Sequence, residues 1–295
     1  MDNAKFLSNI KSTDADVRFN AWRAAGEVDP SVIPELAKLA ASEDPGIAKA
    51  AREALTTMTH AVGKDPKSTN RAAVVKGLLA IDSTLPVRIH AIRLLSNIAD
   101  EDSVAAIAKD IHDVDLREEV VYCLERIPGP AATEAMVKAY AQAKDDFKPR
   151  LLAAFGHRKD VSPNILGLCL FATRSVDREL AVAGAKAFAR IAPKSTSAFP
   201  LPTETGLNET QKTDLLDSRL RFADAQLEQG NPTSALGIYK AMLERNEEHL
   251  QCAAIVGIAK IATAEAAAIL MPKMKSKNRN VRITAQKAWK GLASV

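Results

Sequence analysis

Apolar residues recur along this chain at helical spacing, in short blocks that repeat one another. A complete block holds a capping residue, an apolar residue three positions later, an arginine beside it, and an alanine three positions after the arginine. Asp, Asn or Thr at the start can accept hydrogen bonds from the free N–H groups of a first helical turn. The apolar residue and the alanine are four positions apart and form a stripe on one helix face. Each block therefore predicts the start of an amphipathic helix.

Eight copies of the block, some incomplete, occupy most of the chain. Their first residues are Asp14, Asp44, Thr84, Asp113, Asp146, Asp177 (where the capping position is missing), Asn246 and Asn278. The arginine-equivalent positions are separated by 30, 40, 29, 33, 28, 72 and 32 residues, and steps near 30 fit two helices with short turns. A second amphipathic segment precedes most blocks, over residues 30–41, 68–81, 103–111, 131–143, 162–172 and 264–274. We expect an all-α fold, a right-handed α-solenoid (superhelix) of helix pairs.

The block resembles that of HEAT repeats, specifically the short HEAT-like type first named for phycobilisome lyases. The resemblance covers roughly residues 2–192 and 247–293. It implies a solenoid of HEAT-like helix pairs, but that family includes lyases, scaffolds and assembly factors, so it implies little about function. Because the block arginine lies beside the apolar stripe, we also expect it near the capping acid of the next repeat, in an Asp–Arg ladder.

The 72-residue step departs from the repeat in two ways. Residues 193–208 are rich in Pro, Ser and Thr, which predicts an exposed, protease-sensitive loop. Residues 219–243 resemble one tetratricopeptide repeat, with Gly230-Asn231 at its turn and Tyr239 on its second helix. A single helix pair buries too little apolar surface to fold alone, so it should stack on its neighbours. We therefore divide the chain into a HEAT-like array (1–192), an irregular loop (193–208), a tetratricopeptide-like helix pair (209–245) and C-terminal HEAT-like repeats packed on the same solenoid (246–295).

Positive charge gathers near the C-terminal end. The chain carries 40 basic and 36 acidic residues, and the seven basic residues between Lys273 and Lys290 have no acidic residue among them. Such a segment favours a local contact with an anionic partner, or simply a solvated capping helix. The candidate residues of this basic patch are Lys273, Lys275, Lys277, Arg279 and Lys287.

Residues that could carry chemistry are scattered. The three cysteines stand alone without a CxxC pair, the five histidines are far apart in sequence, and no glycine-rich phosphate loop follows a strand. Deoxyhypusine hydroxylases, a HEAT-repeat enzyme family, hold two irons with His-Glu dipeptides, and this chain has only the reversed pair Glu248-His249. We therefore predict no catalytic residue, no metal site and no cofactor.

A binding surface is the stronger expectation. In arrays of this architecture the second helix of each pair lines the concave side, and positions two and five after the block arginine should point away from the core stripe. The candidate partner-binding residues of this groove are Asn20, Arg23, His90, Arg93, Glu119, Tyr122, Leu152 and Phe155. Aromatic and arginine side chains are common anchors of binding surfaces. The alternative that Leu152 and Phe155 pack between repeats stays open.

The pattern as a whole predicts a non-enzymatic scaffold or assembly factor that binds a protein or peptide in the concave groove. Two alternatives remain: a HEAT-like chromophore lyase or enzyme accessory factor, and a nucleic-acid binder that uses the basic C-terminal helix. The first residues hold no apolar signal core, and no run of about 18 apolar residues occurs. We therefore expect a cytoplasmic protein without a membrane span.

Overall fold

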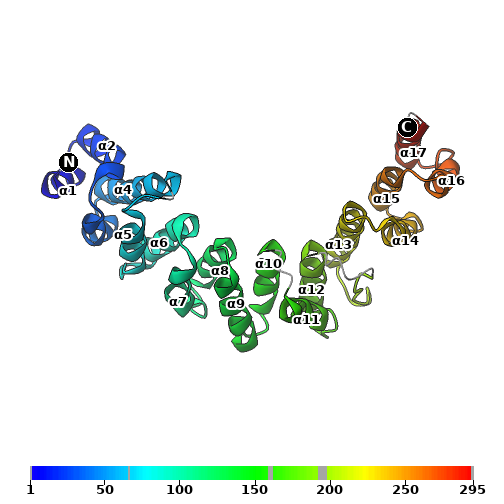
Figure 1. Cartoon of the computed structure of the whole chain (residues 1–295), viewed down its shortest axis with the longest axis horizontal. Helices are drawn as coiled ribbons and strands as arrows, with labels where there is room; N and C mark the ends of the chain where they lie inside the picture. The colour runs from blue at the N-terminus through cyan, green and yellow to red at the C-terminus, as the bar shows by residue number, and fades with distance from the viewer. Residues whose placement is uncertain (1, 66, 159–161, 192–197, 294–295) are drawn as a thin grey trace. The chain divides into compact units, whose positions relative to one another are not determined.

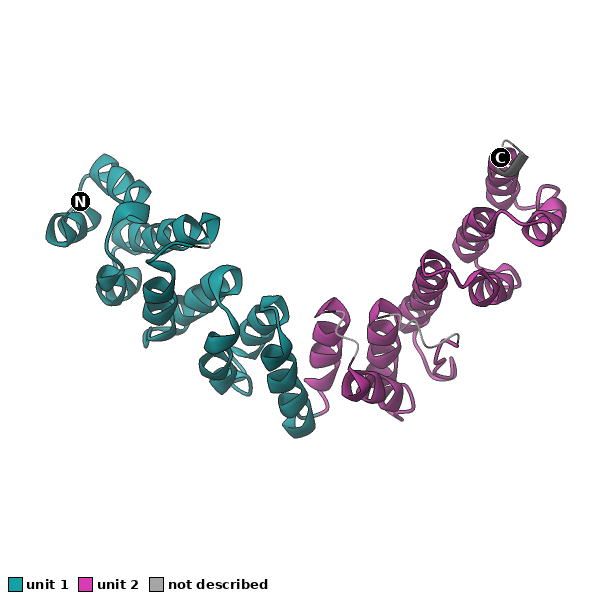
Figure 2. Ribbon diagram, viewed as in Figure 1, with its two compact units in different colours: residues 1–144 teal, residues 145–295 magenta. Residues whose placement is uncertain are grey.

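The computed structural model describes residues 2–65, 67–158, 162–191 and 198–293, which are mainly helical and contain no strand. The prediction of an all-α fold of repeated helix pairs is confirmed. The chain divides into two compact units, residues 1–144 (unit 1) and 145–295 (unit 2) (Figure 2). Among the described residues, no helix is both long enough and apolar enough to cross a lipid bilayer.

Unit 1 contains nine α-helices within its described residues. They are α1 (Asn3–Ile10), α2 (Ala15–Arg23), α3 (Ile33–Ala40), α4 (Pro45–Lys64), α5 (Arg71–Leu79), α6 (Leu85–Ile98), α7 (Val104–Ile107), α8 (Arg117–Arg126) and α9 (Pro130–Gln142). Single 3-10 turns add η1 (Ala25–Glu27), η2 (Pro30–Val32), η3 (Glu101–Ser103) and η4 (Ala108–Asp110). The helices α2, α4, α6 and α8 pack on one another in succession as an inner row, with α3, α5 and α7 outside them.

Unit 2 follows the same plan. Its helices are α10 (Lys148–Arg158), α11 (Pro163–Ala172), α12 (Arg178–Ile191), α13 (Glu209–Glu228), α14 (Pro232–Leu243), α15 (Glu248–Ile261), α16 (Ala264–Lys273) and α17 (Arg279–Ala293). The inner row is α10, α12, α13, α15 and α17, and α11, α14 and α16 pack outside it (Figure 1).

A short Ser-x-Asp or Ser-x-Asn turn starts several inner helices. Before α2, α4, α12 and α17, the serine hydroxyl accepts the N–H of the third residue at 3.1–3.2 Å. The side chain of that third residue then accepts N–H groups from the first helical turn, which satisfies donors that the helix leaves unpaired. Three predicted capping residues are confirmed in this role: Asp14, Asp44 and Asn278. Asp177 has the same role, although the block did not identify it as a cap.

The helix start predicted at Thr84 is right, because Thr84 is the N-cap of α6, but its side chain makes no capping hydrogen bond. Three other predicted helix starts are wrong by a few residues. The N-cap of α15 is Glu247, one residue after Asn246. The N-cap of α8 is Leu116, three residues after Asp113, and α10 begins at Lys148, two residues after Asp146. The buried stripe is out of phase only in the Asp146 and Asn246 copies, where Ala154 and Ala254 are buried in place of Ala153 and Ala253.

Two of the block arginines hold the turn of their own repeat. Nη1 of Arg18 donates to the carbonyl oxygen of Ser12 at 2.6 Å, and Nη1 of Arg282 donates to that of Ser276 at 2.7 Å. Arg88 pairs with Asp110 at 3.0 Å, and not with the predicted partner in the next block. The Asp–Arg ladder is therefore wrong at Arg88. At Arg18 it survives only as a minor electrostatic effect on Asp44, whose pKa is lowered first by the N–H groups of Ile47 and Gly46.

The 72-residue step contains one more inner helix. α13 packs against both α12 and α15, and its N-cap Asn208 forms a capping box with Gln211. Gln211, Lys212 and Leu215 follow Asn208 at the places of the block's apolar residue, arginine and alanine, so this is a ninth copy that keeps only the capping residue. The described part of the preceding loop, 198–208, contains no helix and lies on the side of α11 and α14 (Figure 1). It takes the place of an outer helix.

Apolar side chains fix this loop to both neighbouring inner helices. The ring centroid of Phe199 lies 6.4 Å from that of Phe188 on α12 and 5.5 Å from that of Phe222 on α13. Leu207 is buried in a cluster with Val182 of α12. The prediction of an exposed loop is therefore wrong at Phe199 and Leu207, while residues 193–197 lie outside the described part of the chain.

Tyr239 on α14 joins this helix to α13 before it and to α15 after it. The Tyr239 hydroxyl on α14 donates to Oδ1 of Asp224 on α13 at 2.6 Å, and Tyr239 is 1% exposed. Its ring fills the space that a Cβ atom would need at Gly257 on α15. Only glycine permits this close approach, so the Tyr239 ring on α14 and Gly257 on α15 depend on each other.

Candidate functional site

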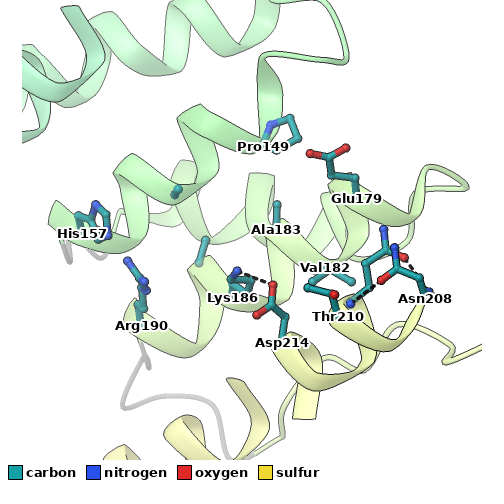
Figure 3. A pocket seen from close by; sticks show the side chains of 13 residues that line it. Pro149, His157, Glu179, Val182, Ala183, Lys186, Arg190, Asn208, Thr210 and Asp214 are labelled. Carbon is teal, nitrogen blue, oxygen red and sulfur yellow. Dashed lines mark hydrogen bonds and ion pairs between the residues drawn. The ribbon is translucent and has the colours of Figure 1, made fainter. Parts of the chain in front are cut away.

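An open groove crosses the inner row of unit 2, between α10, α12 and the start of α13 (Figure 3). Its volume is about 490 Å³, and its lining residues are Pro149, Ala153, His157, Glu179, Val182, Ala183, Lys186, Ala187, Arg190, Asn208, Thr210, Gln211 and Asp214. A second hollow of about 380 Å³ shares His157 and Arg190 with it and extends along α13, lined also by Gly156, Ala189, Arg221, Asp224, Ala225 and Glu228. The two hollows together are called the unit 2 groove below.

One face of α12 forms the floor of this groove. Its lining residues are 179, 182, 183, 186, 187 and 190, which are spaced by three and four and so lie along one stripe of the helix. The middle of the stripe holds the small apolar residues Val182, Ala183 and Ala187. Val182 and Ala187 are buried and Ala183 is half-buried. The groove therefore has a low apolar floor with polar groups around it.

Once the true start of each helix is known, several groove residues lie at the predicted positions, two and five residues after the block arginine. In α12 the cap is Asp177, which makes Ala181 the arginine-equivalent, and the positions two and five later are Ala183 and Lys186. In α13 the block cation is Lys212, and two residues later is Asp214. All three of these residues line the groove.

The structure contradicts two of the predicted groove residues, Leu152 and Phe155. Both are 0% exposed and belong to the core. The cause is that the block at Asp146 lies one residue out of phase with α10. Leu151 and Ala154, which are also 0% exposed, form the buried stripe, while half-buried Ala153 faces the groove.

The two ends of α12 bring opposite charges to the groove. Glu179 lies in the first turn and Arg190 in the last, and neither forms an ion pair with another described residue. Between them, Nζ of Lys186 contacts Oδ2 of Asp214 at 2.8 Å, so this pair adds no net charge (Figure 3). His157 is exposed at the Arg190 end of the groove (Figure 3).

Six predicted groove residues belong to unit 1, and two of them lie on α2. Asn20 and Arg23 are both exposed. The guanidinium carbon of Arg23 lies 5.4 Å from the ring centroid of Phe19, which is 44% exposed and packs edge-on against Trp22 at 5.1 Å. This is a small exposed platform of aromatic and cationic groups, and its partner-binding role stays a prediction.

The other four residues of unit 1 mostly have partners inside the array. Nε2 of His90 lies 3.2 Å from the carbonyl oxygen of Arg52, and burial lowers the pKa of His90, so this ring packs between α4 and α6. Nε of Arg93 donates to Oε2 of Glu119 at 2.9 Å, and this pairing raises the pKa of Arg93. Tyr122 is 40% exposed beneath the guanidinium of Arg126. Of these four residues, Tyr122 offers the largest free apolar surface.

The basic patch is less uniform than the sequence suggests. Lys275, Lys277, Arg279 and Lys287 are exposed, but Lys273 is half-buried and its Nζ donates to the carbonyl oxygen of Leu243 at 3.3 Å. Glu248 also lies at the start of α17, where Asn278 and Asn280 donate to its carboxylate at 2.7 and 2.6 Å. A carboxylate from α15 therefore stands within the patch.

Groups that could carry chemistry are buried or dispersed. Burial raises the pKa of the Cys123 and Cys169 thiols to about 12, so both are protonated at neutral pH. Among the described residues, no group of three or more His, Cys, Asp or Glu side chains is placed to hold a metal ion.

Comparisons with known proteins give no family assignment. No protein-family model matches the sequence, and no curated protein matches it. Among solved structures, human deoxyhypusine hydroxylase in complex with glycerol is 12% identical with a TM-score of 0.35, over 92% of this chain and 99% of that one. An engineered protein is 16% identical with a TM-score of 0.20, over 100% of this chain and 98% of that one. A computationally designed armadillo repeat protein for modular peptide recognition is 17% identical with a TM-score of 0.22, over 88% and 99%. Likenesses at this level transfer no function to this chain.

Proposed function

We propose that this chain is a non-enzymatic scaffold that holds an extended segment of a protein partner in the unit 2 groove. One observation carries the proposal: the stripe of α12 that lines the groove has small apolar residues in the middle and a charged residue at each end. Stretches of protein surface that bind peptides combine apolar contact area with a few placed polar groups. The floor of this groove offers both.

The groove is also built on rigid elements. Its floor residues lie on α12, whose opposite face is packed through Ala181, Ala185 and Phe188, each at most 1% exposed. A side chain held on a packed helix loses little conformational entropy when a partner binds, which favours affinity. The groove continues from the first hollow into the second along α13, so a chain can lie along it.

A substitution that fills the groove tests this function. Ala183 is half-buried on the floor, and Ala183→Arg places a long side chain where the partner segment would lie. Peptides of random sequence displayed on phage are selected on the wild-type chain and their dissociation constants measured by fluorescence anisotropy. We expect Ala183→Arg to weaken the selected peptides by at least about tenfold, because an apolar floor is lost and space is filled.

The matched control is Ala268→Arg, on the exposed surface of the outer helix α16. It adds the same side chain and charge away from the groove and should leave peptide affinity and melting temperature unchanged. Peptides that bind Ala183→Arg as tightly as the wild type, or a selection that yields no binding peptide, would contradict the proposal.

The basic patch favours a second candidate, contact with an anionic partner such as nucleic acid. Its four exposed residues would supply a salt-sensitive attraction. Changing Lys275, Lys277 and Lys287 to Gln should lower the slope of log affinity against log salt for single-stranded DNA. An unchanged slope would leave the patch as a solvated end of the array. A HEAT-like lyase would instead be recognised by bound chromophore, as absorbance above 300 nm in the purified chain.

A further inference from the structure

We infer that the unit 2 groove selects segments that carry one cationic and one anionic side chain, four or six positions apart, with small apolar residues between them. The cation would lie at Glu179 and the anion at Arg190. This inference rests on the proposed function and adds to it the chemistry of the partner.

The spacing follows from helix geometry. Glu179 and Arg190 lie eleven residues apart on the same stripe of α12, and a rise of about 1.5 Å per residue separates them by about 16 Å. An extended chain advances about 3.3 Å per residue and directs alternate side chains to the same edge. A spacing of four residues spans about 13 Å and one of six about 20 Å, which bracket the separation. Either spacing puts both charges on the edge that faces α12.

The two charged ends are available to a partner. Glu179 is exposed and Arg190 is half-buried, and neither has an ion-pair partner within the described part of the chain. Arg190 presents a planar guanidinium that can bind a carboxylate through two hydrogen bonds. Arg221 lines the same hollow as Arg190, but Asp224 and Glu228 line it too, so the selection of an anion rests on Arg190 itself.

The middle of the groove excludes further charge. Lys186 and Asp214 already neutralise each other at 2.8 Å, so they offer no net attraction to a charged residue. Beneath them lie buried Val182 and half-buried Ala183, which favour small apolar side chains because a charged group would lose water without gaining a partner. Along α12 the groove is therefore negative at Glu179, apolar in the middle and positive at Arg190.

The same two residues also suit the dipole of α12, since an acid in the first turn and a base in the last stabilise any helix. That effect depends only on the helix, and it is the same with or without a partner. A change of partner preference, and not a change of stability, is therefore the measurement that decides.

The test uses six fluorescein-labelled twelve-residue peptides. Each carries two test residues, Lys and Glu, Glu and Glu, or Gln and Gln, at a spacing of four or six positions with alanine between them. The wild-type chain should bind a Lys/Glu peptide about tenfold more tightly than its Gln/Gln form, the effect of two charge pairs at a protein surface. Glu179→Arg puts cations at both ends and should reverse the order, so that the Glu/Glu peptide binds best. The control Glu134→Arg changes an exposed acid on α9 in unit 1 and should keep the wild-type order.

Equal affinity of the wild type for the Lys/Glu and Gln/Gln peptides, with both weakened by Ala183→Arg, would overturn this inference and leave the proposed function intact. An unchanged order in Glu179→Arg would also overturn it. Binding that is indifferent to Ala183→Arg would overturn both together.

Discussion

Phe155 and Tyr122 are aromatic residues at equivalent positions of the repeat, yet they lie in different surroundings. Phe155 is 0% exposed in the core of unit 2, whereas Tyr122 is 40% exposed on α8. Phe155→Ala should therefore lower the free energy of unfolding by about 3–5 kcal/mol, the cost of a large cavity. Tyr122→Ala should cost less than about 1 kcal/mol, because a surface side chain leaves no cavity. Urea denaturation of both variants measures the free energy of unfolding. Equal losses in the two variants would show that Phe155 is not buried as described.

The thiols give a residue-scale prediction about pH. The pKa of Cys123 and of Cys169 is about 12 in the folded chain because burial disfavours the thiolate, against 9.0 for an exposed thiol. Above pH 9 the unfolded chain therefore loses these protons first, and the free energy of unfolding falls as pH rises from about 9 to about 12.

At pH 8 in native buffer, the double variant Cys123→Ala/Cys169→Ala should react with a thiol reagent at the wild-type rate. A rate that drops in this double variant would show that one of the buried thiols is reactive.

At the scale of single elements, the caps decide where inner helices begin. The Asp177 side chain accepts N–H groups from Glu179 and Leu180 at the start of α12, at 2.9 and 3.3 Å. Asp177→Ala should therefore cost about 1 kcal/mol. Asn246→Ala should cost much less, because the N-cap of α15 is Glu247. Thermal unfolding of the two variants compares them directly, and a larger loss in Asn246→Ala would contradict the assigned helix start.

The elements were predictable from sequence wherever the cap and the stripe agree. At Asp14, Asp44 and Asn278 the cap, the apolar position and the alanine keep their spacing, and the helices begin where predicted. α10 and α15 show why the rest was not predictable. Both hold adjacent apolar residues, so the buried partner can shift by one place, from Ala153 to Ala154 and from Ala253 to Ala254. Only tertiary packing distinguishes two such alanines.

The same uncertainty about helical phase led to errors in the predicted groove residues. A shift of one residue on α10 exchanges Leu152 and Phe155 for Ala153, and Lys186 was missed because the block did not identify Asp177 as the cap of α12. Asp214 was missed because Lys212 replaces arginine in the ninth block. Searching for Ser-x-Asp turns, and allowing lysine at the cation position, would have found both helix starts. The groove itself depends on three helices packed side by side, which one repeat unit does not specify.

At the scale of the whole molecule, the segment 208–245 should act as part of the stack and not as a tethered domain. It supplies α13 and α14, which contact α12 through Phe222 and α15 through Tyr239. Deleting 208–245 removes one inner and one outer helix and exposes the faces that these rings cover. We expect aggregation, or loss of the helices that follow, because each unit of such an array is stabilised by its neighbours. Circular dichroism and size-exclusion chromatography report this. Unaltered melting, or a stable isolated 208–245 fragment from limited proteolysis, would show an independent domain.

The central claim is that a partner segment lies on the stripe of α12 between α10 and α13, and site-specific crosslinking tests it most directly. A photoreactive phenylalanine analogue is placed at Ala153 on one side of the groove, and at Ala268 on α16 as the control. Each variant is irradiated with a selected peptide, and the adducts are located by mass spectrometry. The account predicts peptide adducts from position 153 and none from position 268. Equal adducts at the two positions, or adducts only at position 268, would contradict it.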